Sequence, residues 1–185
     1  APSERPYLKT GVFQLAKNRI FWLLVLMISS LITGGILAKY ENAFAVLPLL
    51  VTFIPMLTDT GGNAGSQSST LIIRGMAVGE IEPADVFKVV WKELRVGTLV
   101  GVVLAAVNFV QLLIRFPGQP LVCATVVISL MATVILAKTI GCMLPMAAKV
   151  LHMDPAIMAA PLITTIVDAL SLVIYFQLAC ALLGL

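Results

Sequence analysis

Charged residues are few in this sequence. Asp, Glu, Lys and Arg make up 11% of the 185 residues, hydrophobic residues make up 60%, and the mean hydropathy is +1.06. Soluble globular proteins carry about 25% charged residues, so this composition excludes that class and indicates an integral membrane protein. The chain is long enough for about five spans of ~20–25 residues with short connections, and leaves no room for a separate soluble domain.

Other absences narrow the class further. The three cysteines, Cys123, Cys142 and Cys180, lie in apolar runs at unrelated spacings. The sequence therefore offers neither a metal-binding cysteine motif nor a disulfide framework, and we expect these residues to serve in packing. The first apolar run is longer than the ~7–15-residue apolar core typical of signal peptides, which argues against a cleavable signal peptide. No internal repeat is visible, so symmetry around an ion path would require a second copy of the chain.

The apolar runs predict an all-α membrane domain over residues 20–185. We expect five transmembrane helices, near residues 20–38, 44–70, 97–114, 121–148 and 155–184. Residues 1–19 are expected to form a cytoplasmic lead-in helix or linker. Of the 12 Lys and Arg, nine lie before the first span or in the loops that follow the second and fourth spans. The positive-inside rule therefore places the N-terminus inside and the C-terminus outside.

Residues 80–95, between the second and third spans, have the pattern of a helix. Pro83 lies just inside the expected helix start, acidic residues occupy the first turn, and basic residues follow. The apolar residues of one face are Val86, Val89, Val90 and Leu94. Two interpretations remain open: an amphipathic helix at the cytoplasmic interface, or the solvated start of the third span.

Asp168 lies near the middle of the apolar run over residues 156–176. A carboxylate at the centre of a span costs roughly 2.5–3.5 kcal/mol on insertion scales, so such a residue is usually buried, paired or functional. Helical spacing places it on one face with five other residues: Pro161, Thr164, Thr165, Ser171 and Tyr175. This stripe predicts a helix facing a cavity or a partner. The alternative is a structural ion pair with Lys138, which lies at a similar depth in the fourth span.

The second span becomes polar toward its end. Asp59, Asn63 and Gln67 are spaced four apart and share one helical face. Small residues among them can let the backbone break and free carbonyl oxygens; they include Gly61, Gly62 and Gly65. Polar, irregular backbone at membrane depth is tolerated only where it is buried in protein or lines water, which favours a hydrophilic path here. A glycine packing seam, with Asp59 as a helix cap, is the alternative.

These two segments resemble the signatures of one family. Residues 55–67, with the core Gly-Gly-Asn-Ala-Gly-Ser-Gln, are similar to the second-helix signature of the MgtE family of magnesium channels and transporters. Residues 161–176, Pro-Leu-Ile-Thr-Thr-Ile-Val-Asp followed by Ile-Tyr-Phe, resemble its fifth-helix signature. Motif order, spacing and the five-span topology agree over nearly the whole chain. The chain departs at Ala160, where many relatives have Ser or Asn, and at Ser171, where they often have Gly.

The resemblance implies a homodimer in the cell membrane, in a bacterium the inner membrane, with a central pore lined by the second and fifth helices of both copies. Asp168 would face this pore and bind a largely hydrated Mg²⁺, with Thr164 one turn away. The remaining expected pore-lining residues are Asp59, Gly61, Gly62, Asn63, Gln67, Pro161, Thr165, Ser171 and Tyr175. Full-length members also carry a cytoplasmic N-terminal domain and a CBS pair, which we expect to be absent from this chain.

The chemistry of Mg²⁺ agrees with this expectation. Mg²⁺ prefers octahedral oxygen coordination, loses water reluctantly, and is usually held by one or two carboxylates beside retained waters. Two symmetry-related Asp168 residues would supply two negative charges to one hydrated dication. Mn²⁺ and other divalent ions accept similar oxygen ligands, so the preference for Mg²⁺ comes from the resemblance alone. We expect the ion to be cargo, the protein not to be an enzyme, and its partners to include the lipid bilayer but no nucleic acid.

Several other functions stay open at this stage. A Na⁺- or H⁺-coupled divalent cation exchanger could use the same aspartate, and the sequence does not separate a channel from a carrier. An intramembrane aspartyl protease is a remote alternative suggested by Asp59-Thr60-Gly61, but the Gly-x-Gly-Asp motif of such proteases is missing. A scaffold without transport activity would leave the polar faces of two spans unexplained.

Overall fold

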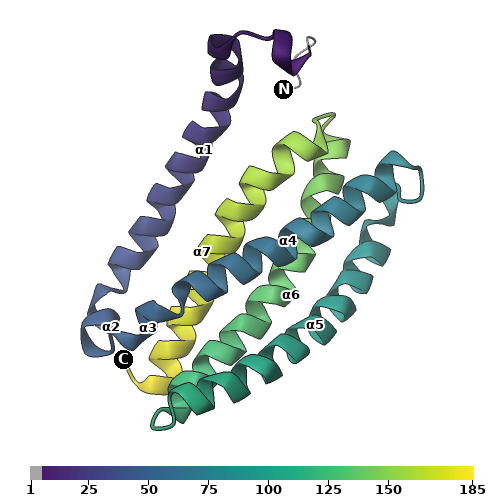
Figure 1. Ribbon diagram of the computed structural model, residues 1–185. Coiled ribbons are helices and arrows are strands. Elements are labelled where there is room, and N and C mark those ends of the chain that lie inside the picture. Colours follow the sequence, from purple (N-terminus) through teal and green to yellow (C-terminus); the bar gives the residue numbers. More distant parts are fainter. Residues whose placement is uncertain (1–5) are drawn as a thin grey trace.

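The computed structural model describes residues 6–185, and over that range the chain is helical with short connections (Figure 1). The long helices are α1 (Val12–Lys39), α4 (Ile54–Ala77), α5 (Val86–Arg115), α6 (Pro120–Val150) and α7 (Pro155–Leu183). The short ones are η1 (Tyr7–Lys9), α2 (Glu41–Val46), α3 (Leu49–Thr52) and η2 (Pro83–Asp85). The predicted all-α class is confirmed. The first part of the expected lead-in, residues 1–5, lies outside the described residues, and the rest of it forms η1 and the start of α1.

Four helical segments of the described chain are long and apolar enough to cross a membrane. They are Val12–Lys39, Pro83–Arg115, Pro120–Val150 and Pro155–Leu183. Each agrees with one of the spans expected from the sequence, and together they identify a multi-pass membrane protein. α4 has 24 residues, enough to cross a membrane, but it is the most polar of the long helices. The fifth crossing and the orientation of the chain therefore stay predictions.

The second expected span is where the structure corrects the sequence analysis. Residues 41–53 form two short helices instead of the start of one helix over 44–70, and α4 continues to Ala77. Pro48 has no backbone N–H and disfavours helical geometry in the residue before it, so the chain leaves the helix at Leu47, with φ −136° and ψ 81°. The expected break among Gly61, Gly62 and Gly65 is absent from α4, which is continuous there.

α6 is the central helix of the bundle, in contact with α4, α5 and α7, while α1 packs mainly on α7. The helices approach closely where small residues meet, as is usual for helices in membranes. The backbones of Gly65 in α4 and Gly141 in α6 are in direct contact, so a Cβ on Gly141 would overlap the Gly65 carbonyl oxygen. On the other side of α6, Gly97 and Gly101 of α5 face the α6 backbone at Ile135 and Met131. Gly65 thus packs as the seam interpretation expected, whereas Gly62 has no neighbour within 4 Å of an added Cβ and Asp59 lies inside α4 instead of capping it.

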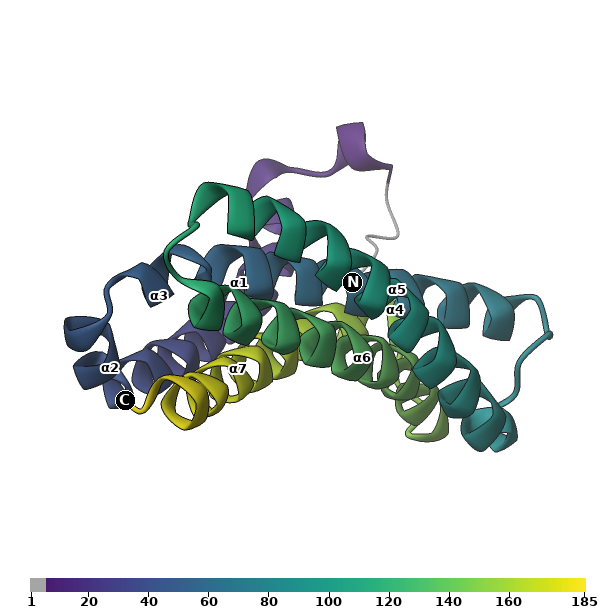
Figure 2. The ribbon, with the colours of Figure 1, turned by 90° about the horizontal axis from the view of Figure 1, so that it is seen from below.

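The short helices α2 and α3 lie beside the C-terminal end of α7 at one end of the molecule in both views (Figures 1 and 2). The Tyr175 hydroxyl donates a hydrogen bond of 2.7 Å to the carbonyl oxygen of Leu50 in α3. Phe176 stacks on Tyr40 and meets Phe44 edge to face, with ring centroids 4.8 Å apart in each pair. These contacts fix α2 and α3 against α7 after the proline has interrupted the helix.

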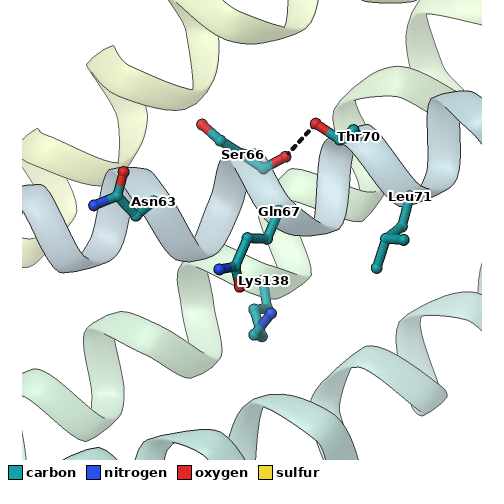
Figure 3. Close-up of a pocket in the computed structure, with 6 residues that line it drawn as sticks. All are labelled: Asn63, Ser66, Gln67, Thr70, Leu71 and Lys138. Carbon is teal, nitrogen blue, oxygen red and sulfur yellow. Dashed lines mark hydrogen bonds between the residues drawn. The ribbon is translucent and has the colours of Figure 1, made fainter.

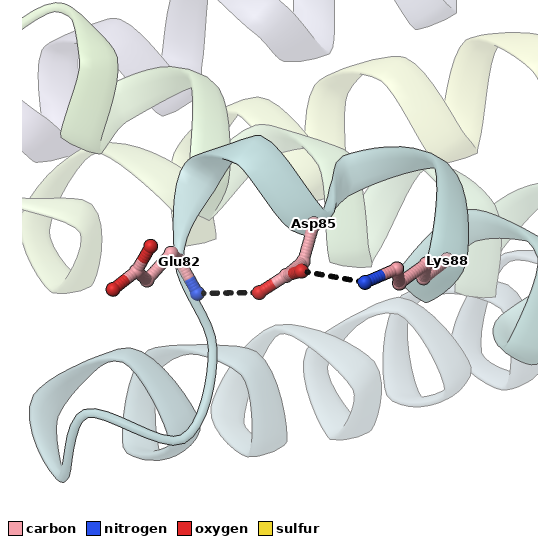
Figure 4. Close-up of polar contacts among 3 residues, drawn as sticks. All are labelled: Glu82, Asp85 and Lys88. Carbon is pink, nitrogen blue, oxygen red and sulfur yellow. Dashed lines mark hydrogen bonds and ion pairs between the residues drawn. The ribbon is translucent and has the colours of Figure 1, made fainter.

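At the opposite end, a short loop connects α4 to α5. The Asp85 carboxylate accepts a hydrogen bond of 3.1 Å from the Glu82 backbone N–H and pairs with Lys88 at 3.5 Å (Figure 4). Val86, Val89 and Val90, which the sequence placed on one apolar face, pack against a buried cluster of Ile72, Met76, Cys142 and Met146. Because α5 runs without a break from Val86 to Arg115, residues 86–95 are the start of this long helix. Their position relative to the membrane interface stays a prediction.

Candidate functional site

α4 presents a row of polar side chains on a face that the other helices leave open. Its exposed members are Asp59, Asn63, Ser66, Gln67 and Thr70, and Gly62 is half-buried beside them with open space where a Cβ would lie. The spacing of three and four residues keeps this row on one side of a helix. We call it the polar face of α4. It includes the three residues whose four-residue spacing predicted a shared face.

α7 contributes a second carboxylate next to this face. Asp168 is half-buried, and the residue before it packs against Gly61 of α4, so Asp168 lies beside the turn of α4 that carries Asp59. Thr164, one turn before Asp168, is exposed and donates its hydroxyl proton to the Ala160 carbonyl oxygen at 3.1 Å, which leaves the hydroxyl oxygen free to accept. The structure therefore brings Asp59, Asp168 and Thr164 to the same open side of the molecule.

The other residues of the predicted stripe on α7 have their side chains in protein contacts. Pro161, Ser171 and Tyr175 are buried, and the Ser171 hydroxyl donates to the Asp168 carbonyl oxygen at 3.0 Å. The Thr165 hydroxyl is half-buried, 2.6 Å from the Ser29 hydroxyl of α1 and 2.8 Å from the Pro161 carbonyl oxygen. These residues share a helical face with Asp168, but α1, α3 and α6 cover most of that face.

Gly61 is also placed for packing. A Cβ at this position would lie 2.7 Å from the side-chain methyl groups of Thr133 in α6 and Val167 in α7. Gly61 thus lets α4 approach both neighbouring helices, whereas Gly62, one residue later, faces the open side. Such close approach between helices is the common use of glycine in membrane proteins.

A cavity of about 650 Å³ continues the polar face toward the C-terminal end of α4. Its lining residues are Asn63, Ser66, Gln67, Thr70, Leu71 and, from α6, Lys138 (Figure 3). The volume is sufficient for a hydrated ion, since one water occupies about 30 Å³ of liquid. Apart from Leu71 and the lysine stem, the wall offers amide and hydroxyl groups that can hydrogen-bond to water.

Lys138 does not form the ion pair with Asp168 that the sequence left open. Its ammonium group points to α4 and α5: Nζ donates to Ser68 Oγ at 3.4 Å, and Ser68 Oγ donates to Glu93 Oε2 at 2.6 Å. The sequence marked Lys138 as a charge within an apolar run, but it gave no sign of Ser68 or Glu93 as its partners. Asp168 is left without a compensating cation among the described ion pairs.

The donor set agrees with a hydrated divalent ion better than with a tightly bound cofactor. Within residues 6–185, no group of three or more His, Cys, Asp or Glu side chains is arranged to hold a metal directly. Asp59 and Asp168 supply two carboxylates, and the neighbouring hydroxyl and amide groups can bind the ion's retained waters. This is the number of carboxylates that Mg²⁺ sites commonly use, because Mg²⁺ usually keeps several of its waters.

The chain is similar in sequence to several magnesium transporters. The magnesium transporter MgtE of Thermus thermophilus is 35% identical over 177 residues, which cover 96% of this chain and 39% of that protein. The magnesium transporter MgtE of Bacillus subtilis is 34% identical over 172 residues, 93% of this chain and 38% of that protein. That of Enterococcus faecalis is 27% identical over 164 residues, 89% of this chain and 36% of that protein. The chain thus spans less than two fifths of the length of these relatives.

The match to the family itself covers the site. Residues 54–178, from the start of α4 to the last turns of α7, match the MgtE family, whose members are described as divalent cation transporters. This range contains Asp59, the polar face of α4, Lys138 and Asp168. It also includes both segments whose motifs resembled the family in the sequence. The chain therefore belongs to the MgtE family of divalent cation transporters.

Proposed function

We propose that this protein carries Mg²⁺ across a membrane through a pore formed by two copies of the chain. The observation that carries the proposal is the placement of Asp59 and Asp168 together on an open polar face of an otherwise apolar bundle. Two like charges at membrane depth destabilise each other and are costly to remove from water. A hydrated dication between them offsets both costs.

A second copy explains why the polar face is open in one chain. A two-fold axis would bring the polar faces of two α4 helices and two α7 helices together around one path, and would shield them from lipid. α4 would then be the fifth crossing, in addition to the four apolar ones. With the basic residues on the inner side, the N-terminus would be cytoplasmic and the C-terminus outside.

In this pore, Asp168 and Asp59 would attract the ion, and Thr164, Asn63 and Gln67 would bind its water shell. Gly62 would leave space for the shell to pass. Because outer-sphere contacts are weaker than direct ligation, the ion can both enter and leave. The other residues of the predicted set would not contact the ion and would hold α4 and α7 in place through their packing and hydrogen bonds: Gly61, Pro161, Thr165, Ser171 and Tyr175.

The test is Mg²⁺ flux into liposomes that contain the purified protein, with Asp168→Asn as the variant and Asp85→Asn as the matched control. Asparagine keeps the volume and hydrogen bonding of Asp168 but removes its charge. We expect the apparent Mg²⁺ affinity to fall by about tenfold or more, which corresponds to about 1.4 kcal/mol. Asp85 lies at the start of α5, away from the polar face, so the apparent Mg²⁺ affinity of Asp85→Asn should stay near that of the parent protein. Unchanged affinity in folded Asp168→Asn protein would contradict the proposal.

The same liposomes distinguish a channel from a coupled exchanger. A channel conducts Mg²⁺ down its own gradient whether or not a Na⁺ or proton gradient is imposed. Flux that requires one of those gradients would establish the exchanger instead. Light scattering of the purified protein tests the dimer, and transport by a protein that remains monomeric would refute the two-copy pore.

In the longer protein that the relatives represent, we propose that cytoplasmic domains contact the basic end of this region. Arg74, Lys88, Lys92 and Arg95 are exposed there, around the loop between α4 and α5. An acidic surface on such a domain would bind this end and shift the balance between closed and open pores, provided that its affinity differs between the two states.

A further inference from the structure

Lys138 is a buried cation near the middle of α6. Its residue exposure is 5%, and 18 residues of α6 precede it while 12 follow. A lysine at the centre of a membrane helix costs about 2.5–3.5 kcal/mol on insertion scales, so its neighbours must compensate its charge. The described residues that do so are Ser68 of α4 and Glu93 of α5.

Lys138, Ser68 and Glu93 form a hydrogen-bonded chain across three helices, which we call the charge-balancing triad. The Ser68 hydroxyl stands between the two charged groups, 3.4 Å from Lys138 Nζ and 2.6 Å from Glu93 Oε2. A hydroxyl-to-carboxylate distance of 2.6 Å is typical of a charge-assisted bond. In the described part of the chain, the lysine and the glutamate make no direct ion pair, so the serine connects them.

Gly97 of α5 makes room for the lysine stem. A Cβ at Gly97 would lie 3.6 Å from Cδ and 3.7 Å from Cβ of Lys138, so the stem runs directly over this glycine. The ammonium group therefore lies next to the turn of α4 that contains Gln67 and Ser68. The position of this charge is set by backbone packing, and it is not free to extend into solvent as a surface lysine does.

The same lysine also forms part of the wall of the 650 Å³ cavity, beside Asn63 and Gln67 of the polar face (Figure 3). A positive charge in this wall would repel a cation moving along α4. Glu93, joined to it through Ser68, supplies the opposite charge. Removing either partner alone would therefore leave a net charge of known sign next to the cavity.

We propose that the charge-balancing triad sets the electrostatic potential of the cavity beside α4, with Glu93 cancelling the repulsion that Lys138 would exert on a dication. Lys138 is the specificity-determining group, because its charge faces the cavity, and Glu93 is a positioning residue that acts through it. This inference rests on the proposed function, in which a dication passes along the polar face of α4.

The proposal predicts opposite effects for the two single neutralisations. Glu93→Gln leaves the lysine uncompensated and weakens the apparent Mg²⁺ affinity. Lys138→Met leaves the glutamate uncompensated and strengthens it. For a unit charge about 10 Å from a dication in a water-filled path, each change is about three- to tenfold. The double variant is neutral and should fall between the two single variants, whereas a merely structural role would move both single variants in the same direction.

The experiment measures Mg²⁺ flux against Mg²⁺ concentration in liposomes containing the full chain, with Lys149→Met as the matched control. Lys149 is exposed near the end of α6, so its loss should change the affinity less than twofold. Lys138→Arg keeps the charge, so its apparent Mg²⁺ affinity should stay near that of the parent protein, without the gain expected in Lys138→Met. If Glu93→Gln fails to fold, Lys138→Met is compared with the double variant, since these two differ only in the charge at residue 93.

Two outcomes overturn the proposal: both single variants shifting the affinity in the same direction, or neither shifting it while Asp168→Asn does. The second outcome would leave the proposed pore intact and reject only the role of the triad. Failure of the proposed function gives a different result, because the parent protein would then show no Mg²⁺ flux or Asp168→Asn would behave as the parent does.

Discussion

Substituting Gly141 with alanine tests the closest helix contact in the structure. Gly141 of α6 lies against the backbone of Gly65 in α4, and an added Cβ would overlap the Gly65 carbonyl oxygen and lie 2.9 Å from its carbonyl carbon and Cα. All three atoms belong to the backbone of a helix, so none can move aside as the tip of a flexible side chain can. The two helices would have to separate, and α4 carries the polar face.

The size of the effect follows from the kind of overlap. Inserting one methyl group into a packed interior usually costs about 1–3 kcal/mol, and contact with backbone atoms places Gly141→Ala at the upper end. For a chain of this length, 1 kcal/mol lowers the midpoint of thermal unfolding by about 2–4 °C, so the overlap alone lowers it by about 6–12 °C. The higher helix propensity of alanine offsets at most about 1 kcal/mol, so we expect a net loss of at least about 4 °C.

The assay is thermal unfolding of the purified protein in detergent, followed by the loss of the folded peak in size-exclusion chromatography. Gly34→Ala is the matched control, because Gly34 lies in α1 and has nothing within 4 Å of an added Cβ. We expect the control to be at least as stable as the parent protein. A midpoint for Gly141→Ala within 2 °C of the parent, where about 4 °C or more is expected, would show that α4 and α6 do not meet backbone to backbone.

Two further substitutions test the connections. Tyr175→Phe removes the 2.7 Å hydrogen bond to the buried Leu50 carbonyl oxygen and should lower the stability by about 1–3 kcal/mol. The control Tyr40→Phe loses only the exposed 3.0 Å bond from Gln177 and should stay within about 0.5 kcal/mol of the parent protein. Equal midpoints of the two variants in thermal unfolding would refute this prediction. Gly79→Ala places a side chain on a residue with φ +78° and should lower the stability by about 1–2 kcal/mol. The control Gly118→Ala lies in open space at another turn and should leave the stability unchanged. Equal stabilities of the two variants would contradict the left-handed turn after α4.

Much of the fold follows from composition and apolar runs. α6 and α7 begin and end within two residues of the predicted spans, because long apolar segments bounded by prolines and polar loops leave few alternatives. The broken helix was not foreseen, although Pro48 stood inside the run. Whether Pro48 breaks the helix depends on contacts from a distant part of the chain, such as the hydrogen bond from Tyr175 to Leu50, which stabilise the non-helical backbone.

The site could be predicted in part. The four-residue spacing of Asp59, Asn63 and Gln67 determined that they share a face of α4, and the central position of Asp168 made it a candidate site residue. Periodicity identifies the residues on one helical face, but it does not say which part of that face a neighbouring helix covers. For this reason Tyr175 shared the predicted stripe with Asp168 and yet is fully buried.

The sequence by itself determined that the chain is a multi-pass membrane protein with carboxylates and amides on two helices, because burying polar groups in lipid is too costly to be accidental. Only the tertiary structure decided which of these groups meet. Asp59 and Asp168 lie in different helices, more than a hundred residues apart, and the direction of Lys138 depends on the closeness of α4, α5 and α6 at their glycines. That closeness comes from backbone contacts between helices distant in sequence, which no local pattern of residues encodes.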